Sequence, residues 1–299
     1  NLVVVPASAV ATSSSGDVTA SVTVDLQSAS IPTGITLTYA WQITRTDGST
    51  ARSAIAPVEW ADNRYDWTLL TGGVIRLHYF QLDTAFAQQI LASAQSTVAL
   101  LEKPYGVPHS RTIDIWVYPD STSFRGSLPA NTRDTVAGGS FVGFSLIVAV
   151  IPNGSTSEVR RVIPHEVSHQ MLYQATRNPF TILPVWFDEG MATHIQVGGT
   201  ATYLGMVINS YRNDALFDLT SLAAAFPYDA SQATLAYAAS WSAVLYIEET
   251  YGTSGIERMI AAFKSGDPAD GVIRSALGIS MDQFNRNWKA WIGTLPSTS

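Results

Sequence analysis

The sequence predicts an α+β fold with a small antiparallel β-domain at the N-terminus and a larger domain that combines a mixed sheet with a helical C-terminal part. Three observations support this prediction. From Val18 to Phe80, apolar and polar residues alternate with the period of half-buried strands. From Asp83 to Glu102, apolar residues recur at helical spacing, and the same spacing dominates from Val185 to Ile292. Strands followed by helices are typical of α+β proteins.

Three segments are predicted along the chain. Residues 1–16 end in a polar Thr-Ser-Ser-Ser-Gly run and are expected to form a flexible tail. Residues 17–80 are expected to form a β-sandwich-like domain, with strands near 18–24, 35–43 and 74–80. Residues 81–299 are expected to form the second domain.

The second domain is predicted to begin with a helix at 83–102, a strand at 112–118 and a long loop at 119–139. The apolar run 141–151 has two interpretations that the sequence leaves open. It is either an internal core strand or a sheet edge that holds an extended peptide as an added strand.

The helix predicted at Ser155–Thr176 contains Pro164, which predicts a kink or a helix start just before His165. Further helices are predicted at 185–195, 203–212, 216–225, 234–251, 256–263, 270–277 and 281–292.

Composition excludes several classes of protein. Hydrophobic residues make up 46% and charged residues 14% of the 299 residues, so a large core can form. The net charge of −7 without a basic run argues against nucleic acid as a partner. No apolar run approaches the ~20 residues of a membrane span. Because cysteine is absent, disulfides and thiolate metal ligands are excluded.

Two weaker features concern localisation. The first hundred residues are poor in charge and rich in Ser, Thr, Gly, Trp and Tyr, which favours an extracellular or cell-surface protein. The chain begins at Asn1 rather than Met, so we expect that a leader has been removed.

One motif stands out in the middle of the chain, His165-Glu166-Val167-Ser168-His169. Residues four apart share a helix face at roughly 5–6 Å, so both histidines can bind one zinc ion. Glu166 lies beside them, where a carboxylate can act as general base on a water molecule. The alternative is a pair of structural histidines and an ion-pairing glutamate.

A second segment follows the motif, Trp186-Phe187-Asp188-Glu189-Gly190-Met191-Ala192. Together the two segments resemble the gluzincin zinc metallopeptidases, and more closely the bacterial peptidase MA-like domain, over residues 80–290. The run from Tyr237 to Tyr246, followed by Tyr251-Gly252, matches a further segment of that domain. The resemblance implies a thermolysin-like catalytic domain that hydrolyses peptide bonds and binds one catalytic Zn²⁺ through His165, His169 and Glu189.

Further residues are expected to take part in the site or to lie outside it. Gluzincins stabilise the oxyanion with a downstream Tyr or His, and Tyr237 is the best positional match, with Tyr203, Tyr228 and Tyr246 as competitors. Asp188 and Thr193 are expected to orient the ligand histidines. A fourth protein ligand would close the site, so His78, His109 and His194 are expected to be structural or surface residues.

The expected substrate is a peptide or protein. Aminopeptidases of the wider clan carry a Gly-x-Met-Glu-Asn stretch, but the corresponding residues 138–143 here have no carboxylate, which favours an endopeptidase. Two alternatives stay open. The chain could be a surface-binding or structural protein with a zinc-stabilised scaffold, or a zinc hydrolase of a non-peptide amide.

Overall fold

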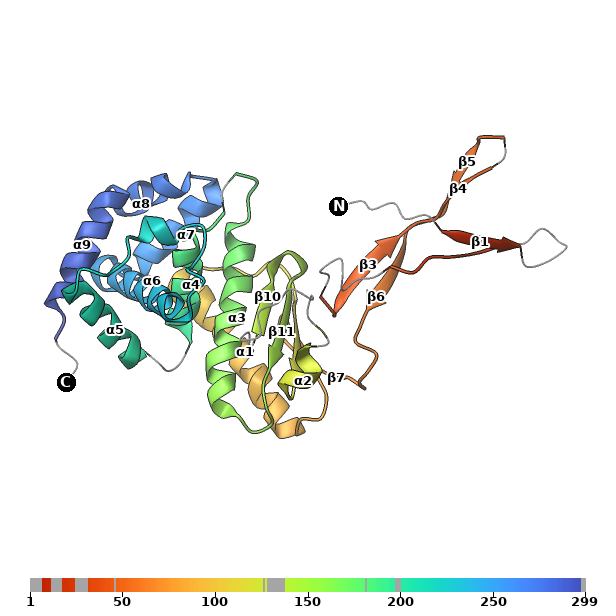
Figure 1. Cartoon of the computed structure of the whole chain (residues 1–299), viewed down its shortest axis with the longest axis horizontal. Coiled ribbons are helices and arrows are strands. Elements are labelled where there is room, and N and C mark those ends of the chain that lie inside the picture. Colours follow the sequence, from red (N-terminus) through yellow and green to blue (C-terminus); the bar gives the residue numbers. More distant parts are fainter. Residues whose placement is uncertain are drawn as a thin grey trace.

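The computed structural model describes residues 7–11, 18–24, 32–45, 47–125, 127, 138–180, 182–196 and 200–296. Three parts follow one another along the long axis of the molecule (Figure 1). An arm of β-hairpins comes first, a central sheet with two long helices and one short helix follows, and a group of helices ends the chain. The predicted α+β fold is confirmed.

The central sheet is mixed and has five strands in the order β10-β11-β9-β8-β7. The strands are β7 (Thr68–Gly72), β8 (Ile75–Tyr79), β9 (Ile113–Tyr118), β10 (Gly138–Phe141) and β11 (Leu146–Val150). The three inner strands are parallel to one another, and the two edge strands are antiparallel to their neighbours. Strands β7 and β8 precede the predicted boundary at residue 80 and pair within this sheet, while the boundary itself stays a prediction.

Beyond Phe141, the apolar run 141–151 does not form the edge of the sheet. Strand β11 lies between β10 and β9 with all five of its residues buried, so the internal-strand interpretation is confirmed and the edge interpretation is wrong. The edge strand is β10, whose first residues belong to the segment predicted to be a loop. That segment also contains the short helix α2 (Ser121–Arg125), and residues 126 and 128–137 lie outside the described residues. Gly138 and Gly139 carry no side-chain pattern, so only pairing with β11 identifies this strand.

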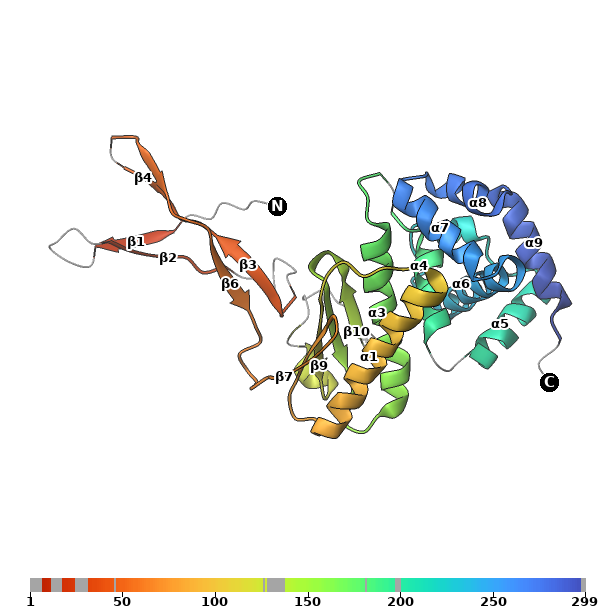
Figure 2. The same cartoon turned by 180° about the vertical axis from the view of Figure 1, so that it is seen from behind.

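Helices α1 (Thr84–Tyr105) and α3 (Thr156–Thr176) pack against each other and against one face of the sheet (Figure 2). Helix α3 continues through Pro164, so the predicted helix start just before His165 is wrong, while the alternative of a kink stays a prediction. Proline removes one backbone hydrogen bond. Pro164 and its neighbours Val162, Ile163 and Val167 are buried, and burial in the core stabilises the helix despite this loss.

The C-terminal part is helical, as predicted. It contains α4 (Val185–Ile195), α5 (Thr200–Arg212), α6 (Ala230–Tyr251), α7 (Thr253–Ser265), α8 (Ala269–Leu277) and α9 (Met281–Thr294). The helix predicted at 216–225 is only a 3₁₀ turn, η2 (Leu219–Leu222); another such turn, η1 (Val142–Phe144), joins β10 to β11. No helix of the described residues is both long and apolar enough to cross a bilayer.

The N-terminal arm consists of three separate antiparallel pairs. They are β1 (Ser8–Ala11) with β2 (Val18–Ser21), β3 (Ile35–Tyr39) with β6 (Ala56–Trp60), and β4 (Gln42–Thr44) with β5 (Thr50–Arg52). Strand β1 lies inside the stretch predicted to be a tail, of which residues 1–6 and 12–16 lie outside the described residues. The antiparallel pairing expected for this part is confirmed.

The second face of the sheet is covered by an aromatic cluster, here defined as Tyr65, Trp67, Phe80, Trp116, Tyr118 and Phe124. Ile35 of β3 is buried in the same cluster, which attaches the arm to the sheet. Asp62 lies at the edge of the cluster, where it accepts hydrogen bonds from Arg64 at 2.6 Å and from the Tyr118 hydroxyl at 2.9 Å. Burial alone would raise the pKa of Asp62, but these bonds hold it below its usual value.

Candidate metal centre

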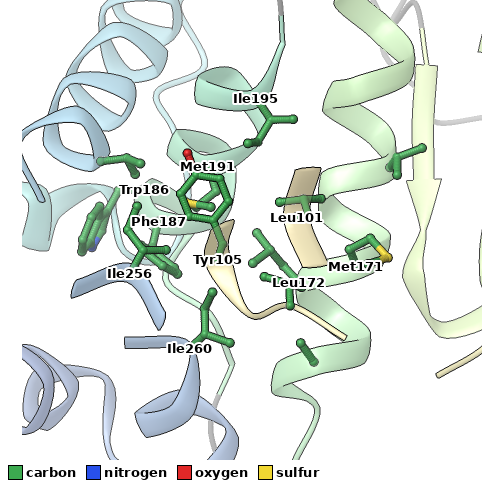
Figure 3. Packing of buried hydrophobic residues seen from close by; sticks show 14 of the residues in the cluster. Leu101, Tyr105, Met171, Leu172, Trp186, Phe187, Met191, Ile195, Ile256 and Ile260 are labelled. Carbon is green, nitrogen blue, oxygen red and sulfur yellow. The ribbon is translucent and has the colours of Figure 1, made fainter. Parts of the chain in front are cut away.

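Helices α3 and α4 pack side by side, and α4 also lies against α6. Trp186 and Phe187 of α4 are buried in the same core cluster as Leu172 of α3 (Figure 3). Gly190 allows α4 to approach α6 closely, because a Cβ at this position would lie 2.6 Å from the carbonyl oxygen of Ser240. The aromatic and glycine residues of the second signature therefore fix the position of α4, which carries Glu189.

The three predicted ligands converge. The Nε2 atoms of His165 and His169 are 3.3 Å apart, and Oε2 of Glu189 lies 3.3 Å from the first and 3.6 Å from the second. The ligand atoms of all three residues lie within 4.8 Å of one another. No other group of three His or acidic residues in the described part of the chain meets this condition.

The arrangement fits a zinc ion. Oε2 of Glu189 is buried and makes no well-directed hydrogen bond within the described residues, although His165 lies close to it. Two imidazole nitrogens face this oxygen, and imidazole with carboxylate is a common donor set for zinc. Three protein donors leave a coordination position open, as catalytic zinc sites require.

Each ligand histidine has a partner on its other ring nitrogen. Nδ1 of His169 lies 3.0 Å from Oδ1 of Asp188, and Nδ1 of His165 lies 3.2 Å from Oε1 of Gln196. The contact of Asp188 was predicted. The one expected of Thr193 is not found, because its buried hydroxyl has no hydrogen-bond partner within the described residues. Sequence reasoning missed Gln196, although it follows Glu189 by seven residues and thus two turns on one helix face.

The charges around the site are strongly coupled. Burial lowers the pKa of His169, but the charge and hydrogen bond of Asp188 outweigh it and raise that pKa to about 10. Burial would raise the pKa of Glu189, yet the close contact with His165 and the charges of the two histidines hold it below its usual value.

Glu166 is buried, with 8% of its surface exposed, and burial raises its pKa despite the opposing effect of the two histidines. Its carboxylate lies against the edge strand, since a Cβ on Gly138 would be 3.0 Å from Oε1. The hydroxyl of Ser140 in the same strand donates to the backbone oxygen of Glu166 at 3.3 Å. The candidate base therefore lies between the ligand helix and β10, with a pKa displaced toward the range of a proton acceptor at neutral pH.

Tyr237 lies on α6 near the site. Its ring centroid is 6.4 Å from that of His165 and 4.9 Å from that of Phe226. The competing tyrosines lie in other surroundings: Tyr228 is 85% exposed, Tyr246 is buried against Phe284, and Tyr203 packs on Trp241. Tyr237 is the candidate whose ring contacts a predicted ligand, and its chemical role stays a prediction.

The three remaining histidines take part in contacts outside the site. His194 pairs with Glu248 at 2.9 Å, and His78 pairs with Asp114 at 3.0 Å and stacks on a tryptophan of the aromatic cluster. His109 pairs with Glu102. Their expected structural or surface roles agree with these contacts.

A helix with the His-Glu-x-x-His motif and a third donor from a Glu on the following helix is the arrangement of the gluzincin class of metallopeptidases. The family model of the Peptidase MA superfamily matches residues 93–294, more than half of the chain. The chain belongs to this superfamily. A comparison with curated proteins finds no match.

Solved structures provide distant likenesses. One is a two-domain M1 zinc metallopeptidase, in a mutant form bound to L-arginine, with 15% identity over 87% of this chain and 64% of that chain and a TM-score of 0.46. Another is an M1 zinc metallopeptidase from Deinococcus radiodurans, with 15% identity over 90% of this chain and 64% of that chain and a TM-score of 0.44. The chain thus spans less than two thirds of these proteins.

Proposed function

We propose that this chain is a zinc-dependent metallopeptidase that cleaves within peptide chains, with His165, His169 and Glu189 as ligands. The observation that carries the proposal is the convergence of these three side chains beside a buried Glu166 with a raised pKa. A zinc ion held there would supply Lewis-acid chemistry, that is, polarisation of the scissile carbonyl and activation of a water molecule.

Glu166 acts as the general base and then as the acid. Its carboxylate takes a proton from the attacking water and delivers it to the leaving amine. Burial raises the pKa of Glu166, and a higher pKa makes its carboxylate a better acceptor for the proton of water. The ring of Tyr237, next to His165, supports a role for its hydroxyl in stabilising the oxyanion.

Strand β10 offers a place for the substrate backbone. It forms one edge of the sheet and carries Gly138 directly against Glu166. An extended peptide can add to such an edge through main-chain hydrogen bonds. Residues 138–141 carry no carboxylate that would bind a free amino terminus, which favours internal cleavage over aminopeptidase action.

The composition of the first hundred residues supports an extracellular or cell-surface location for this activity. The substrate would then be a peptide or protein outside the cell.

The proposal is tested with purified protein, casein and a peptide library, each with and without 1,10-phenanthroline. Cleavage that the chelator stops and added Zn²⁺ restores supports a metallopeptidase. Internal fragments, rather than single residues released from the amino terminus, support an endopeptidase. Bound zinc without chelator-sensitive cleavage of either substrate would overturn the proposal in favour of a zinc-stabilised scaffold or a hydrolase of another amide.

A further inference from the structure

We infer that Gln196 is a positioning residue of the metal centre, which holds the imidazole of His165 with its Nε2 atom toward the ion. This inference rests on the proposed zinc site. It assigns a role to a residue outside both sequence signatures, on the basis of the 3.2 Å contact between Oε1 of Gln196 and Nδ1 of His165.

The backbone holds Gln196 in place for this role. The residue caps the C-terminus of α4, and its N–H donates to the carbonyl oxygen of Ala192. Its neighbour Ile195 is buried in the core. Because these interactions involve the backbone and the preceding side chain, a substitution at Gln196 removes the side-chain contact and leaves the helix end in place.

The position of the proton on the imidazole of His165 determines which kind of partner Nδ1 needs. A neutral imidazole that offers its Nε2 lone pair to a metal carries its proton on Nδ1. That N–H needs an acceptor, which fixes both the tautomer and the rotation of the ring. Nε2 of His165 faces His169 and Glu189, and Nδ1 faces Gln196, so the amide oxygen of Gln196 is the acceptor.

The two ligand histidines have unlike partners. His169 faces the carboxylate of Asp188, whereas His165 faces a neutral amide. Carboxylates of Asp188, Glu189 and Glu166 already surround the site and influence one another. A neutral acceptor orients His165 without a fourth negative charge, which would counteract the positive charge that activates water.

The experiment uses the full chain loaded with Co²⁺ or Zn²⁺. In the Co²⁺ protein, the Nδ1–H of each ligand histidine gives a paramagnetically shifted, exchangeable proton resonance. We expect two such resonances in the wild type. Gln196→Ala should expose one to rapid exchange, and Asp188→Ala should expose the other. The Zn²⁺ affinity of Gln196→Ala, measured by competition with a chromophoric chelator, should fall roughly 10- to 100-fold.

Two further variants separate the proposed role from a general effect on folding. Gln196→Glu retains an acceptor oxygen and should restore both the protected resonance and Zn²⁺ affinity. Gln88→Ala changes an exposed glutamine of α1 and should behave as the wild type. Wild-type resonances and affinity in Gln196→Ala would overturn the inference and leave the proposed peptidase intact. A wild type that binds no Co²⁺ or Zn²⁺ would overturn both.

Discussion

One face of the central sheet packs against α1 and α3 through aliphatic side chains, whereas the opposite face packs against the aromatic cluster and the arm. The helix-covered face includes Ile75, Leu77, Ile113, Ile115 and Ile147. On the opposite face, the ring centroids of Tyr65 and Phe80 stack at 4.0 Å and those of Trp67 and Trp116 lie 4.6 Å apart. The two faces thus differ in both the residues that build them and the elements that they hold.

The candidate metal site lies on one side of the sheet, and the contacts that attach the N-terminal arm lie on the other. The proposed ligand and base residues lie on α3 and α4, on the helical side, while Asp62 and the aromatic cluster attach the N-terminal arm. Substitutions on the first side should therefore change metal binding or turnover, and substitutions on the second should change stability while the site stays intact. Four substitutions test this division, in order of decreasing expected effect.

Glu166→Gln should have the largest effect. Removal of the base should lower turnover by about 10²- to 10⁴-fold, because proton transfer by a positioned side chain contributes that much. Zinc content and the unfolding midpoint should stay at wild-type values, as measured by metal analysis and circular dichroism. Glu158→Gln, two turns earlier on α3, is the matched control and should retain activity. Wild-type turnover in Glu166→Gln would remove this residue from the mechanism.

Gly190→Ala should come next. The added methyl would meet the Ser240 carbonyl at 2.6 Å, and a backbone group cannot move away cheaply. We expect a loss of roughly 1–3 kcal/mol in unfolding free energy, together with weaker zinc binding because α4 carries Glu189. Gly271→Ala in α8 is the control, since a Cβ at that position would lie 3.6 Å from its nearest neighbouring atom, which is ordinary van der Waals contact. Equal stability of the two variants would show that the close approach of α4 to α6 is not required.

Asp62→Asn tests the aromatic face. Loss of the charge-assisted bonds to Arg64 and Tyr118 should cost about 1.5–3 kcal/mol at pH 7, with the zinc content unchanged. The folded-state pKa of Asp62 is lowered, so its contribution is present above the unfolded-state pKa and is lost as the pH falls through the folded-state value. Urea unfolding followed by tryptophan fluorescence should therefore distinguish the variant from wild type at pH 7 and less so in acid. A constant difference at all pH values would contradict this account, and Asp47→Asn on the exposed arm is the control.

Gly138→Ala should have the smallest effect. Its Cβ would lie 3.0 Å from both Oε1 of Glu166 and Cγ1 of Val162, so the base must shift by a few tenths of an ångström. We expect kcat/KM to fall about tenfold, which corresponds to about 1.4 kcal/mol, with stability nearly unchanged. Gly143→Ala, in the turn after β10, meets nothing within 4 Å and should be neutral. Equal kcat/KM for both variants would show that β10 does not constrain Glu166.

Sequence reasoning succeeded where contacts are local. The spacing of His165 and His169 places them on one helix face, and the Trp-x-x-Glu-Gly-x-Ala resemblance placed Glu189 beside them. The expected helix start after Pro164 was wrong, because burial of the neighbouring side chains in the folded core outweighs the local cost of proline.

The missed features depend on residues far apart in the sequence. Strand β10 begins with two glycines and forms only by pairing with β11. The partner of Gln196 is 31 residues away, and Asp62 meets Tyr118 across 56 residues. Alternation within a strand indicates which residues share a face, but not that the second face of this sheet is covered by rings from 65–80 and 116–124. These features therefore depend on tertiary contacts that local sequence patterns do not indicate.

The central claim is that His165, His169 and Glu189 together hold one zinc ion. The most direct test is the zinc content per chain, measured by mass spectrometry of the metal after dialysis, for wild type, Glu166→Gln and Glu189→Ala. We predict one zinc ion per chain in the first two proteins and strongly reduced zinc in the third, with all three folded. Equal zinc content in the wild type and Glu189→Ala would contradict the account.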